Sequence, residues 1–369
     1  MSASRLNILA LASYPVEAAA TRFRLAQFVA PLREHGIELT ISPFLDSEQF
    51  RVHYSPRGVV RKSAGLARPL VRRAGEALSS RRYDAVIVQR EAMFFGPAIF
   101  EWLMQKIGGR PMILDLDDAT YVSYLSPSYG RIGTFFKFFG KTNRLIDRAD
   151  LVTCGNRFIA EYCAKRGART EIIPTIADPE LFRPVANQNQ IPVVGWVGTH
   201  STYPFLAWLF PVLERLAEKQ RFVLKVVGAN RDDIAVRNVD IINEAWSLDR
   251  EVSDFQSLDI GLYPITVSDS ASEEWLQGKS GFKAIQYLAV GVPFVMSPVG
   301  VCAEIGEAGV THFNALDHDQ WYEALDRLLA DQGLRHEMGR AGRQHSLENY
   351  SVPMHTETLA RSIRSLIQK

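Results

Sequence analysis

The sequence predicts an α/β protein built from two doubly wound domains with parallel sheets, facing a cleft. A buried-type strand at 6–12, a helix at about 22–35 and a strand at 37–42 form a β–α–β unit, which favours a parallel sheet. A second such unit begins at 193–227. Between them, residues 174–190 are rich in proline and polar side chains, as is typical of a linker.

The composition is that of an ordinary globular protein. The 369 residues are enough for two domains. Hydrophobic residues make up 47% and charged residues 22%, and the net charge of +1 gives no overall attraction to nucleic acid. The three cysteines form no C-x-x-C pair, which argues against a disulfide framework or a structural zinc and favours a reducing compartment.

The apolar segments are short. The first residues are not hydrophobic enough for a signal peptide, and the chain has no run of about 18 apolar residues that would span a membrane. We therefore expect a cytoplasmic protein, with peripheral contact to the inner face of the membrane as an option.

Further strands follow the first unit, at 84–89, 112–116, 151–154 and 171–173, with a helix at 97–107. Ligands of doubly wound sheets bind at the carboxyl ends of the strands. Residues just after these strands are therefore candidates for a binding site.

Four charged residues fall at such positions. Arg22 and Arg24 lie where the first loop meets its helix, and Arg90 and Glu91 follow a strand. We expect them to face the cleft and to grip a substrate. The alternative is that the arginines are ordinary surface residues of the helix.

Three acids end the strand at 112–116: Asp115, Asp117 and Asp118. Such a group could hold a divalent metal ion. It could equally accept hydrogen bonds from sugar hydroxyls or cap the next helix.

Two segments suggest contact with an anionic membrane. Residues 57–82 carry eight cations against one acid, with apolar residues at near-helical spacing, and residues 135–144 mix phenylalanine with cations. The alternative is that both are helices whose apolar sides pack on their own domain.

The second half contains strands at 193–197, 222–227, 259–262 and 293–296. Before the last strand, residues 278–291 read as a glycine-bearing loop and a short helix that ends at a glycine. A helix start presents free N–H groups and a positive dipole, and Lys279 and Lys283 add two cations. This indicates an anion site, most simply for a phosphate or diphosphate. The alternative is an ordinary helix with two solvated lysines.

Together these residues resemble retaining glycosyltransferases of the B-type fold, family four, also called glycosyl transferases group 1. Val193-Val194-Gly195-Trp196-Val197-Gly198 resembles the first donor-domain strand, and 258–264 a later one. Residues 278–297 resemble the glutamate-x7-glutamate motif with its gly-x-pro ending, and 297–304 the following loop. In the first half, 173–184 resembles the end of the acceptor domain. The resemblance covers nearly the whole chain and implies two Rossmann-like domains.

The sequence departs from the family at its motif. Gly278 and Gln286 stand where the two glutamates are found, and Thr199-His200-Ser201-Thr202 stands where an Arg and a Lys neutralise the diphosphate. This Gly-Lys-x-Gly-Phe-Lys-x-x-Gln-Tyr variant looks like a bacterial subgroup. Gln286 can still form hydrogen bonds to a ribose, but without charge.

The resemblance implies an enzyme that moves a sugar from a nucleotide-diphosphate-sugar to a glycan or lipid-linked acceptor, in cell-surface polysaccharide or glycoconjugate synthesis. It implies retention, no metal and no permanently bound cofactor. The catalytic candidates are Lys279, Lys283, Asp117 and Glu91, and the acceptor candidates are Arg22, Arg24, Arg90 and Asp118. The residues expected to bind the donor are Thr199, His200, Ser201, Trp246, Gly281, Phe282, Gln286 and Glu304.

For several of these a structural role is an equal alternative, such as core packing for Trp246 and helix capping for His200 or Glu304. Two other functions remain open: a nucleotide-sugar hydrolase or epimerase of the same fold, and a degenerate protein that binds a nucleotide-sugar without turnover. We expect domains at 1–185 and 186–353, for acceptor and donor, with a helix at 354–369 that crosses back to the first domain.

Overall fold

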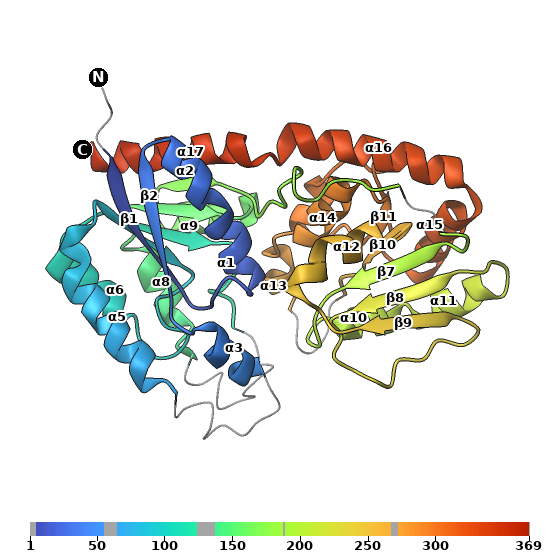
Figure 1. Cartoon of the computed structure of the whole chain (residues 1–369), viewed down its shortest axis with the longest axis horizontal. Helices are drawn as coiled ribbons and strands as arrows, with labels where there is room; N and C mark the ends of the chain where they lie inside the picture. Colours follow the sequence, from blue (N-terminus) through green and yellow to red (C-terminus); the bar gives the residue numbers. More distant parts are fainter. Residues whose placement is uncertain (1–4, 55–64, 124–136, 187–188, 267–271, 369) are drawn as a thin grey trace. The chain divides into compact units, whose positions relative to one another are not determined.

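The computed structural model describes residues 5–54, 65–123, 137–186, 189–266 and 272–368. They form two compact units. The first comprises Met1–Thr175, Gly278–Ser280 and Val352–Lys369, and the second Ile176–Gln277 and Gly281–Ser351. Each unit is a doubly wound α/β structure, as the sequence predicted (Figure 1).

The first unit has a parallel sheet of six strands in the order β2-β1-β3-β4-β5-β6. The strands are β1 (Leu6–Ala12), β2 (Ile37–Pro43), β3 (Ala85–Gln89), β4 (Met112–Leu116), β5 (Leu151–Cys154) and β6 (Thr170–Ile172). The chain leaves β1 toward β2 and then returns past β1 to β3, so the topological switch lies between β1 and β3. All residues of β3 to β5 are buried, which matches their continuous apolar sequences.

Helices cover both faces of this sheet. They are α1 (Ala19–Arg24), α2 (Val29–Glu34), α3 (Ser47–Tyr54), α5 (Ala67–Ser79), α6 (Ile99–Leu103), α8 (Gly140–Ile146), α9 (Arg157–Lys165) and α17 (Val352–Ile367), with short turns η1 (Ala26–Phe28), η2 (Ser80–Arg82) and η3 (Met104–Gly108). Right-handed crossovers place α1 and α2 on one face and α5, α6, α8 and α9 on the other. The last helix, α17, packs on α2, where Arg364 donates to the His35 carbonyl (Figure 1).

The second unit repeats the plan, in the order β12-β11-β10-β7-β8-β9. Its strands are β7 (Val193–Val197), β8 (Val223–Val227), β9 (Asp240–Glu244), β10 (Ile260–Tyr263), β11 (Phe294–Met296) and β12 (Phe313–Asn314). The switch point lies between β7 and β10. Ligands of such sheets bind at the carboxyl edge of the switch point. We therefore expect a ligand at the loops after these two strands and at the helix that follows β10.

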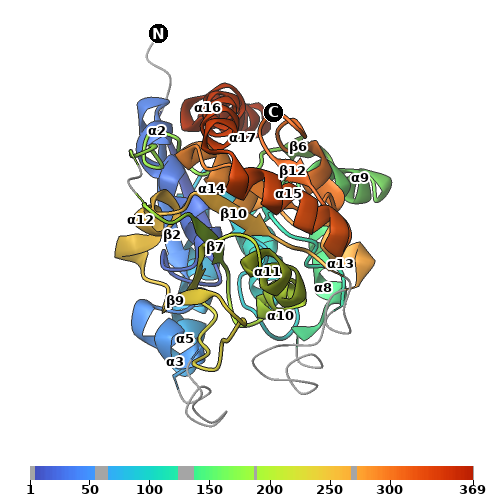
Figure 2. The same ribbon diagram turned by 90° about the vertical axis from the view of Figure 1, so that its right-hand side faces the viewer.

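The helices of this unit are α10 (Tyr203–Trp208), α11 (Phe210–Ala217), α12 (Glu251–Gln256), α13 (Glu273–Gln277), α14 (Phe282–Val290), α15 (His318–Ala330) and α16 (Gln332–Asn349), with the short turns η4 (Leu248–Arg250) and η5 (Gly300–Glu304). On one face α11 packs against α15, as Figure 2 shows, around a core centred on the fully buried Trp321. On the other face α14 packs against α12 and α16.

Proline explains where one predicted helix is broken. The helix expected at 22–35 is divided into α1, η1 and α2, and Pro31 falls in the first turn of α2. A proline has no N–H to donate and its ring crowds the carbonyl four residues earlier, but the first turn tolerates both. Pro211 starts α11 in the same way, after the break at Leu209.

The basic segment at 57–82 is only partly described, because its first eight residues lie outside the described ranges. Within α5, the Arg73 side chain points into the unit and donates to the carbonyl oxygens of Ala12, Ser42 and Ala92. Arg72 donates to the carbonyls of two residues at the end of β2. Two of the eight cations therefore bind backbone rather than a membrane surface. Burial lowers the pKa of Arg73, against the attraction of Glu76.

The phenylalanine-rich segment at 135–144 starts outside the described residues. Lys137 and Lys141 turn inward and form ion pairs with Glu91, at 3.8 and 2.8 Å. These lysines do not present a cationic face to the outside. Within the described parts of the chain, no helix is both long enough and apolar enough to cross a bilayer.

Candidate functional site

In the second unit, three strand ends meet around Gly198. A Cβ atom added to Gly228, which follows β8, would come within 2.4 Å of the Gly198 carbonyl oxygen and 3.3 Å of the Trp246 Cβ. Trp246 follows β9, so the loops after β7, β8 and β9 are in close contact. The structure thus brings Trp246 to the carboxyl edge of the sheet, beside the loop that starts at Gly198.

This loop exposes the polar residues that the sequence singled out. Thr199, His200 and Ser201 are all exposed, directly after β7 at the switch point. The Thr199 and Ser201 hydroxyls lie 2.8 Å apart, and the Thr199 carbonyl accepts from the Tyr203 N–H at the start of α10. The hydroxyls therefore line a tight turn at the carboxyl edge of the sheet, where they can donate to a ligand.

Helix α14 begins at the same edge. Its N-cap is Gly281, in the left-handed region at φ 65°, and its C-cap is Gly291, at φ 68°. A Cβ at Gly281 would lie 2.2 Å from Ile305 Cδ1, so this position needs glycine for space as well as for conformation. The first N–H groups of the helix, from Phe282 onward, follow directly.

Lys283 is held in a defined position on the first turn of α14. Its Nζ donates to Gln286 Oε1 at 3.0 Å and lies 5.2 Å from the centre of the Phe255 ring. Gln286 is completely buried, and its Nε2 has no hydrogen-bond partner among the described residues. The structure therefore shows Gln286 as a support for the lysine, in a position that solvent does not reach.

The loop after β11 was expected to contribute Glu304. This residue is exposed and lies at the end of η5, so it does not start a helix. The loop itself is fixed at Gly300, where a Cβ would lie 2.4 Å from the Gln277 carbonyl oxygen at the end of α13.

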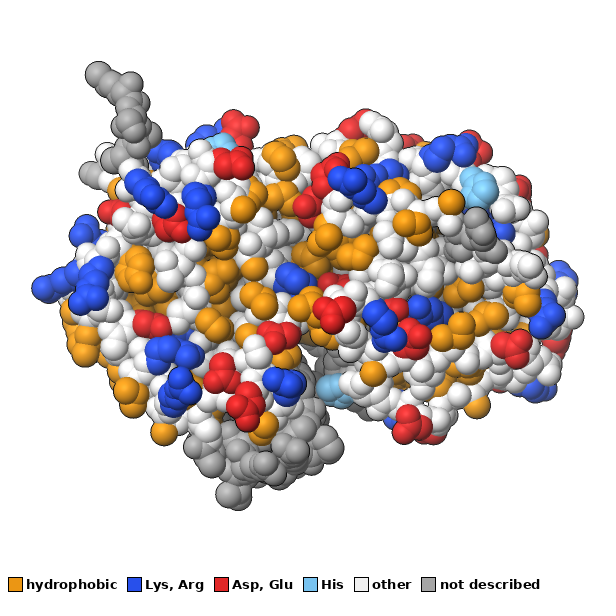
Figure 3. All heavy atoms as spheres, viewed as in Figure 1, with side chains coloured by type: hydrophobic (Ala, Val, Ile, Leu, Met, Phe, Trp, Pro, Cys, Tyr) orange, Lys and Arg blue, Asp and Glu red, His pale blue; other side chains and the backbone are white. Residues whose placement is uncertain are grey.

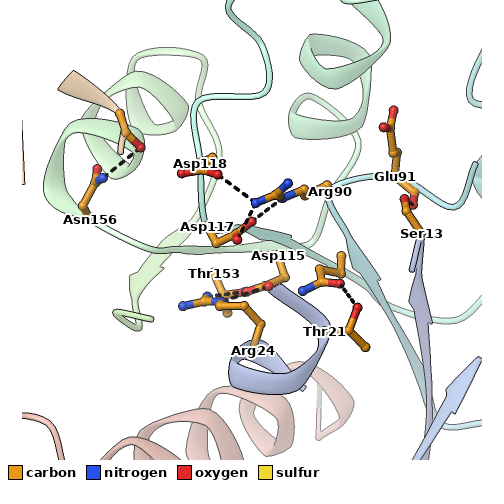
Figure 4. Close-up of polar contacts among 12 residues, drawn as sticks. Ser13, Thr21, Arg24, Arg90, Glu91, Asp115, Asp117, Asp118, Thr153 and Asn156 are labelled. Atoms are coloured by element: carbon orange, nitrogen blue, oxygen red, sulfur yellow. Dashed lines mark hydrogen bonds and ion pairs between the residues drawn. The ribbon is translucent and has the colours of Figure 1, made fainter. Parts of the chain in front are cut away.

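In the first unit, an arginine–carboxylate cluster occupies the carboxyl edge of β3 and β4 (Figure 4). The Arg90 guanidinium donates to both carboxylate oxygens of Asp117, at 2.5 and 2.6 Å, and to Asp118 at 2.8 Å. Arg90 has φ 59°, in a region that non-glycine residues rarely adopt. Such strain is concentrated at functional sites, so the cluster is a candidate.

The two carboxylates of this cluster differ in acidity. Burial favours the neutral acid at Asp117, but the charge and hydrogen bonds of Arg90, with the charge of Arg24, outweigh it and lower the pKa. Burial and the neighbouring Asp117 charge raise the pKa of Asp118, despite Arg90 and Lys279. Adjacent carboxyl groups with pKa values pushed apart are typical of sites that handle protons or polar ligands.

Arg24 lies deeper than the sequence suggested. Its side chain is buried and forms a two-point ion pair with Asp115, at 2.5 and 3.1 Å, and a hydrogen bond to the Ile173 carbonyl. Thr153 also donates to Asp115, at 2.7 Å. We therefore replace the expected acceptor-gripping role of Arg24 with a structural one: it ties α1 to the ends of β4 and β6.

Arg22 and Glu91 are also engaged within the unit. Arg22 donates to the carbonyls of Val16 and Glu17, so it holds the loop after β1. Glu91 is buried beside Lys141, and the Ser13 hydroxyl donates to its backbone carbonyl. Both residues shape the loops of the site, and a buried, paired Glu91 is poorly placed to act on a substrate.

Residues 278–280, which carry Lys279, belong to the first unit by their contacts. Asn156 Nδ2 donates to the carbonyls of Gly278 and Lys279, at 3.2 and 3.0 Å, and the Ser280 N–H bonds to the Asp118 carboxylate. A Cβ at Gly278 would lie 2.2 Å from Ala119 Cβ, so a glutamate at this position would have no room.

Sequence reasoning missed Asn156. It lies two residues after the end of β5 and also caps α9, where its Oδ1 accepts from the Ile159 N–H at 2.9 Å. Its position after a strand was the available signal.

The three acids at the end of β4 do not converge as a metal site would require, because Asp115 binds Arg24 while Asp117 and Asp118 bind Arg90. Among the described residues, no group of three or more His, Cys, Asp or Glu side chains is placed to hold a metal ion.

Comparison with known proteins found one matching family model. The model of a family described as glycosyl transferases group 1 matches residues 191–331, which run from just before β7 to the end of α15. No curated protein sequence matches the chain.

Solved structures resemble the chain over nearly its whole length. A glycosyltransferase from Rickettsia africae is 13% identical with a TM-score of 0.71, covering 100% of both chains. HepE from Anabaena in complex with UDP-glucose is 14% identical with a TM-score of 0.68, covering 98% of this chain and 100% of that one. Sucrose-phosphate synthase from Thermosynechococcus elongatus is 14% identical with a TM-score of 0.66, covering 99% and 100%. The fold is therefore the two-domain Rossmann-like fold of these enzymes.

Proposed function

We propose that the protein is a glycosyltransferase that moves a sugar from a nucleotide-diphosphate-sugar to a glycan or lipid-linked acceptor. One observation carries this proposal. Helix α14 starts at a left-handed glycine on the switch-point edge of the second sheet, inside the segment that matches the family model, and it holds a cation on its first turn. A helix start of this kind binds a diphosphate.

The chemistry would proceed by stabilising the leaving group. When the glycosidic bond to the diphosphate breaks, negative charge grows on the β-phosphate. Fixed N–H groups of Phe282 and Lys283, with the Lys283 ammonium, stabilise that charge more than they stabilise the ground state. We keep Lys279 as a catalytic candidate from the sequence, and we assign the Thr199 and Ser201 hydroxyls hydrogen bonds to the phosphate oxygens.

The nucleoside would lie over the loops after β7 to β9. Trp246, at this edge, offers a face on which a base can stack, and His200 and Glu304 are exposed near strand ends where they can bind phosphate or ribose. Gln286 is buried and bonded to Lys283, so we now give it a positioning role. HepE was solved with UDP-glucose, and a UDP-sugar is therefore the first donor to test.

The acceptor would bind at the carboxyl edge of the first sheet, next to Arg90, Asp117 and Asp118. Paired carboxylates and a guanidinium are suited to sugar hydroxyls, which both donate and accept hydrogen bonds. We keep retention of configuration, a metal-independent reaction and a place in bacterial cell-surface glycan synthesis as parts of the proposal, and we name no nucleophile.

The decisive experiment is a thermal-shift screen of UDP-, GDP-, ADP- and CMP-sugars, followed by a turnover assay on the donor that stabilises. A ligand that binds only the folded state raises Tm by mass action. Transfer to an added glycan or lipid-linked acceptor, with EDTA present, would support the proposal. Free sugar or an epimer from the donor alone would indicate the hydrolase or epimerase instead. Tight binding without turnover would indicate a degenerate binding protein.

A further inference from the structure

Helices α5 and α6 each expose a stripe of apolar and basic side chains. On α5 the outward residues are Arg68, Val71 and Leu78, with Val71 74% and Leu78 62% exposed. From α6 into η3 they are Ile99, Trp102 and Lys106, with Trp102 43% exposed. Spacings of three, four and seven residues place each set on one side of its helix. Single exposed apolar side chains are ordinary on protein surfaces, and it is their grouping into one patch with basic side chains that marks an interaction surface.

The two stripes form one surface. Both helices lie on the same face of the first sheet and pack against each other. Arg81 and Arg110 connect them, because Arg81 Nε donates to the Ile107 carbonyl and Arg110 donates to the Arg81 carbonyl. In Figure 3, hydrophobic and basic side chains lie side by side at the left edge, over α5 and α6.

Within residues 65–110 the exposed charges of this surface have one sign. Every residue from 65 to 110 is described, and in this range five cations are exposed: Arg68, Arg81, Arg82, Lys106 and Arg110. None of the four acids in the range is exposed. Three of them are bonded inside the unit: Glu76 to Arg73, Glu91 to Lys141, and Glu101 to the Ala92 N–H. Two exposed acids lie near Arg148: Asp147, which pairs with Arg166, and Asp150, which accepts from the Met112 N–H.

A hollow opens on the same surface. It is lined by Trp102, Gln105, Lys106 and Arg148, with a volume of about 280 Å³. Gln105 Nε2 donates to the Arg148 carbonyl at 2.9 Å, which fixes its rim. Two cations beside an indole ring suit a phosphate group at the interface between water and lipid.

We propose that this α5–α6 surface binds an anionic lipid bilayer, with a phospholipid headgroup in the hollow at Lys106 and Arg148. Aliphatic side chains for the acyl region, a tryptophan at headgroup depth and a group of exposed cations are the combination that interfacial binding requires. The proposal does not depend on the reaction that the protein catalyses. It also differs from the sequence interpretation, since Arg72, Arg73, Lys137 and Lys141 take no part in it.

The test is flotation of the full-length protein with vesicles of phosphatidylcholine, or of phosphatidylcholine with phosphatidylglycerol. We expect binding only to the anionic vesicles, weakening as salt is raised. Each cation near an anionic surface is worth about fivefold in partition, so Lys106→Glu with Arg148→Glu should reduce binding about 25-fold or more. Val71→Ser with Leu78→Ser should reduce it about tenfold or more.

Matched controls lie in the second unit. Leu316 is 65% exposed, and Arg340 is exposed on α16, so Leu316→Ser and Arg340→Glu should bind like the unchanged protein. Circular dichroism and Tm would verify that every variant is folded. The proposal is overturned if the unchanged protein does not float with anionic vesicles. It is also overturned if the α5–α6 variants float as well as the unchanged protein, or if the control variants lose as much binding as the α5–α6 variants.

Discussion

Arg90 and Asp117 lie at the carboxyl ends of the neighbouring strands β3 and β4, and the arginine donates to both oxygens of the carboxylate. The arginine backbone is held at φ 59° while it does so. A strained backbone and a two-point ion pair at one residue mean that the rest of the unit stabilises a conformation that the residue alone would avoid.

This strain can be separated from the ion pair by two substitutions. Arg90→Ala and Arg90→Gly both remove the guanidinium, but only glycine adopts a positive φ freely. We expect the glycine variant to be more stable than the alanine variant by about 1 kcal/mol in urea unfolding. The order should reverse at Arg340, in the middle of α16, where glycine costs about 1 kcal/mol relative to alanine. Equal stability of the two Arg90 variants would contradict a strained backbone.

The pH dependence of stability should change when Glu101 is replaced. Burial, reinforced by the charge of Glu91, raises the pKa of this carboxyl group in the folded state, against the Ala92 N–H and Lys141. The folded state therefore holds the proton more tightly than the unfolded chain does. Stability is greatest below the unfolded pKa, at about 4.3, and falls as the pH rises through the folded value.

Gln is a neutral match for the protonated acid and can still accept from the Ala92 N–H. Relative to the unchanged protein, Glu101→Gln should therefore gain stability as the pH rises, and the gain should vanish under acid conditions. Tm measured from pH 4.5 to 8.5 checks this. Glu161→Gln, at an exposed side chain, should show no such trend. A difference that is constant across the range would mean that the carboxyl group does not titrate as expected.

Lys283 should be important for turnover rather than for folding. Lys283→Ala removes a fixed charge from the first turn of α14, and we expect kcat/KM to fall by about 100-fold or more. Lys219→Ala, at an exposed lysine of the same unit, should leave it unchanged. Steady-state kinetics with the donor found in the screen measures both. An unaffected Lys283→Ala enzyme would remove the diphosphate assignment.

Gln286 offers a test of the positioning role. Gln286→Leu removes a buried amide whose Nε2 has no partner among the described residues, so its effect on unfolding should be within about 1 kcal/mol. It also removes the acceptor for Lys283, so kcat/KM should fall toward that of Lys283→Ala. Gln286→Glu keeps an oxygen for the lysine and should restore most of the activity. If Gln286→Leu is fully active, the amide does not position the lysine.

Gly281→Ala should damage the start of α14. The new Cβ would meet Ile305 Cδ1 at 2.2 Å, at a φ of 65°, and we expect a loss of about 1 to 3 kcal/mol in unfolding free energy together with weaker nucleotide binding. Gly75, inside α5, has no atom within 4 Å of such a Cβ. Gly75→Ala should therefore stabilise the protein by about 0.5 to 1 kcal/mol.

Local patterns predicted most strands because apolar runs fill the centres of both sheets. They missed β9, an edge strand whose residues are half-buried or exposed, and β12, which has only two residues. They also merged α1, η1 and α2 into one helix. A long, buried strand has a continuous apolar sequence that is easy to recognise, whereas a short or exposed strand does not.

For the site, sequence order located residues after strands but not what they bind. Arg90, Asp117 and Thr199 lie at strand ends as expected. The partner of Arg24 is Asp115, 91 residues away, and Arg73 binds carbonyls from three strand ends. Such pairings depend on which strands become neighbours, and a local pattern contains no information on that.

The return of α17 to the first unit has a consequence for how the gene can be divided. Neither unit is encoded by one continuous stretch, since the first takes residues from both ends of the chain. A shortened chain that stops after β6 would leave α2 without the helix that covers it. An exchange of the second unit between relatives must therefore replace an internal cassette and keep both termini from the same parent.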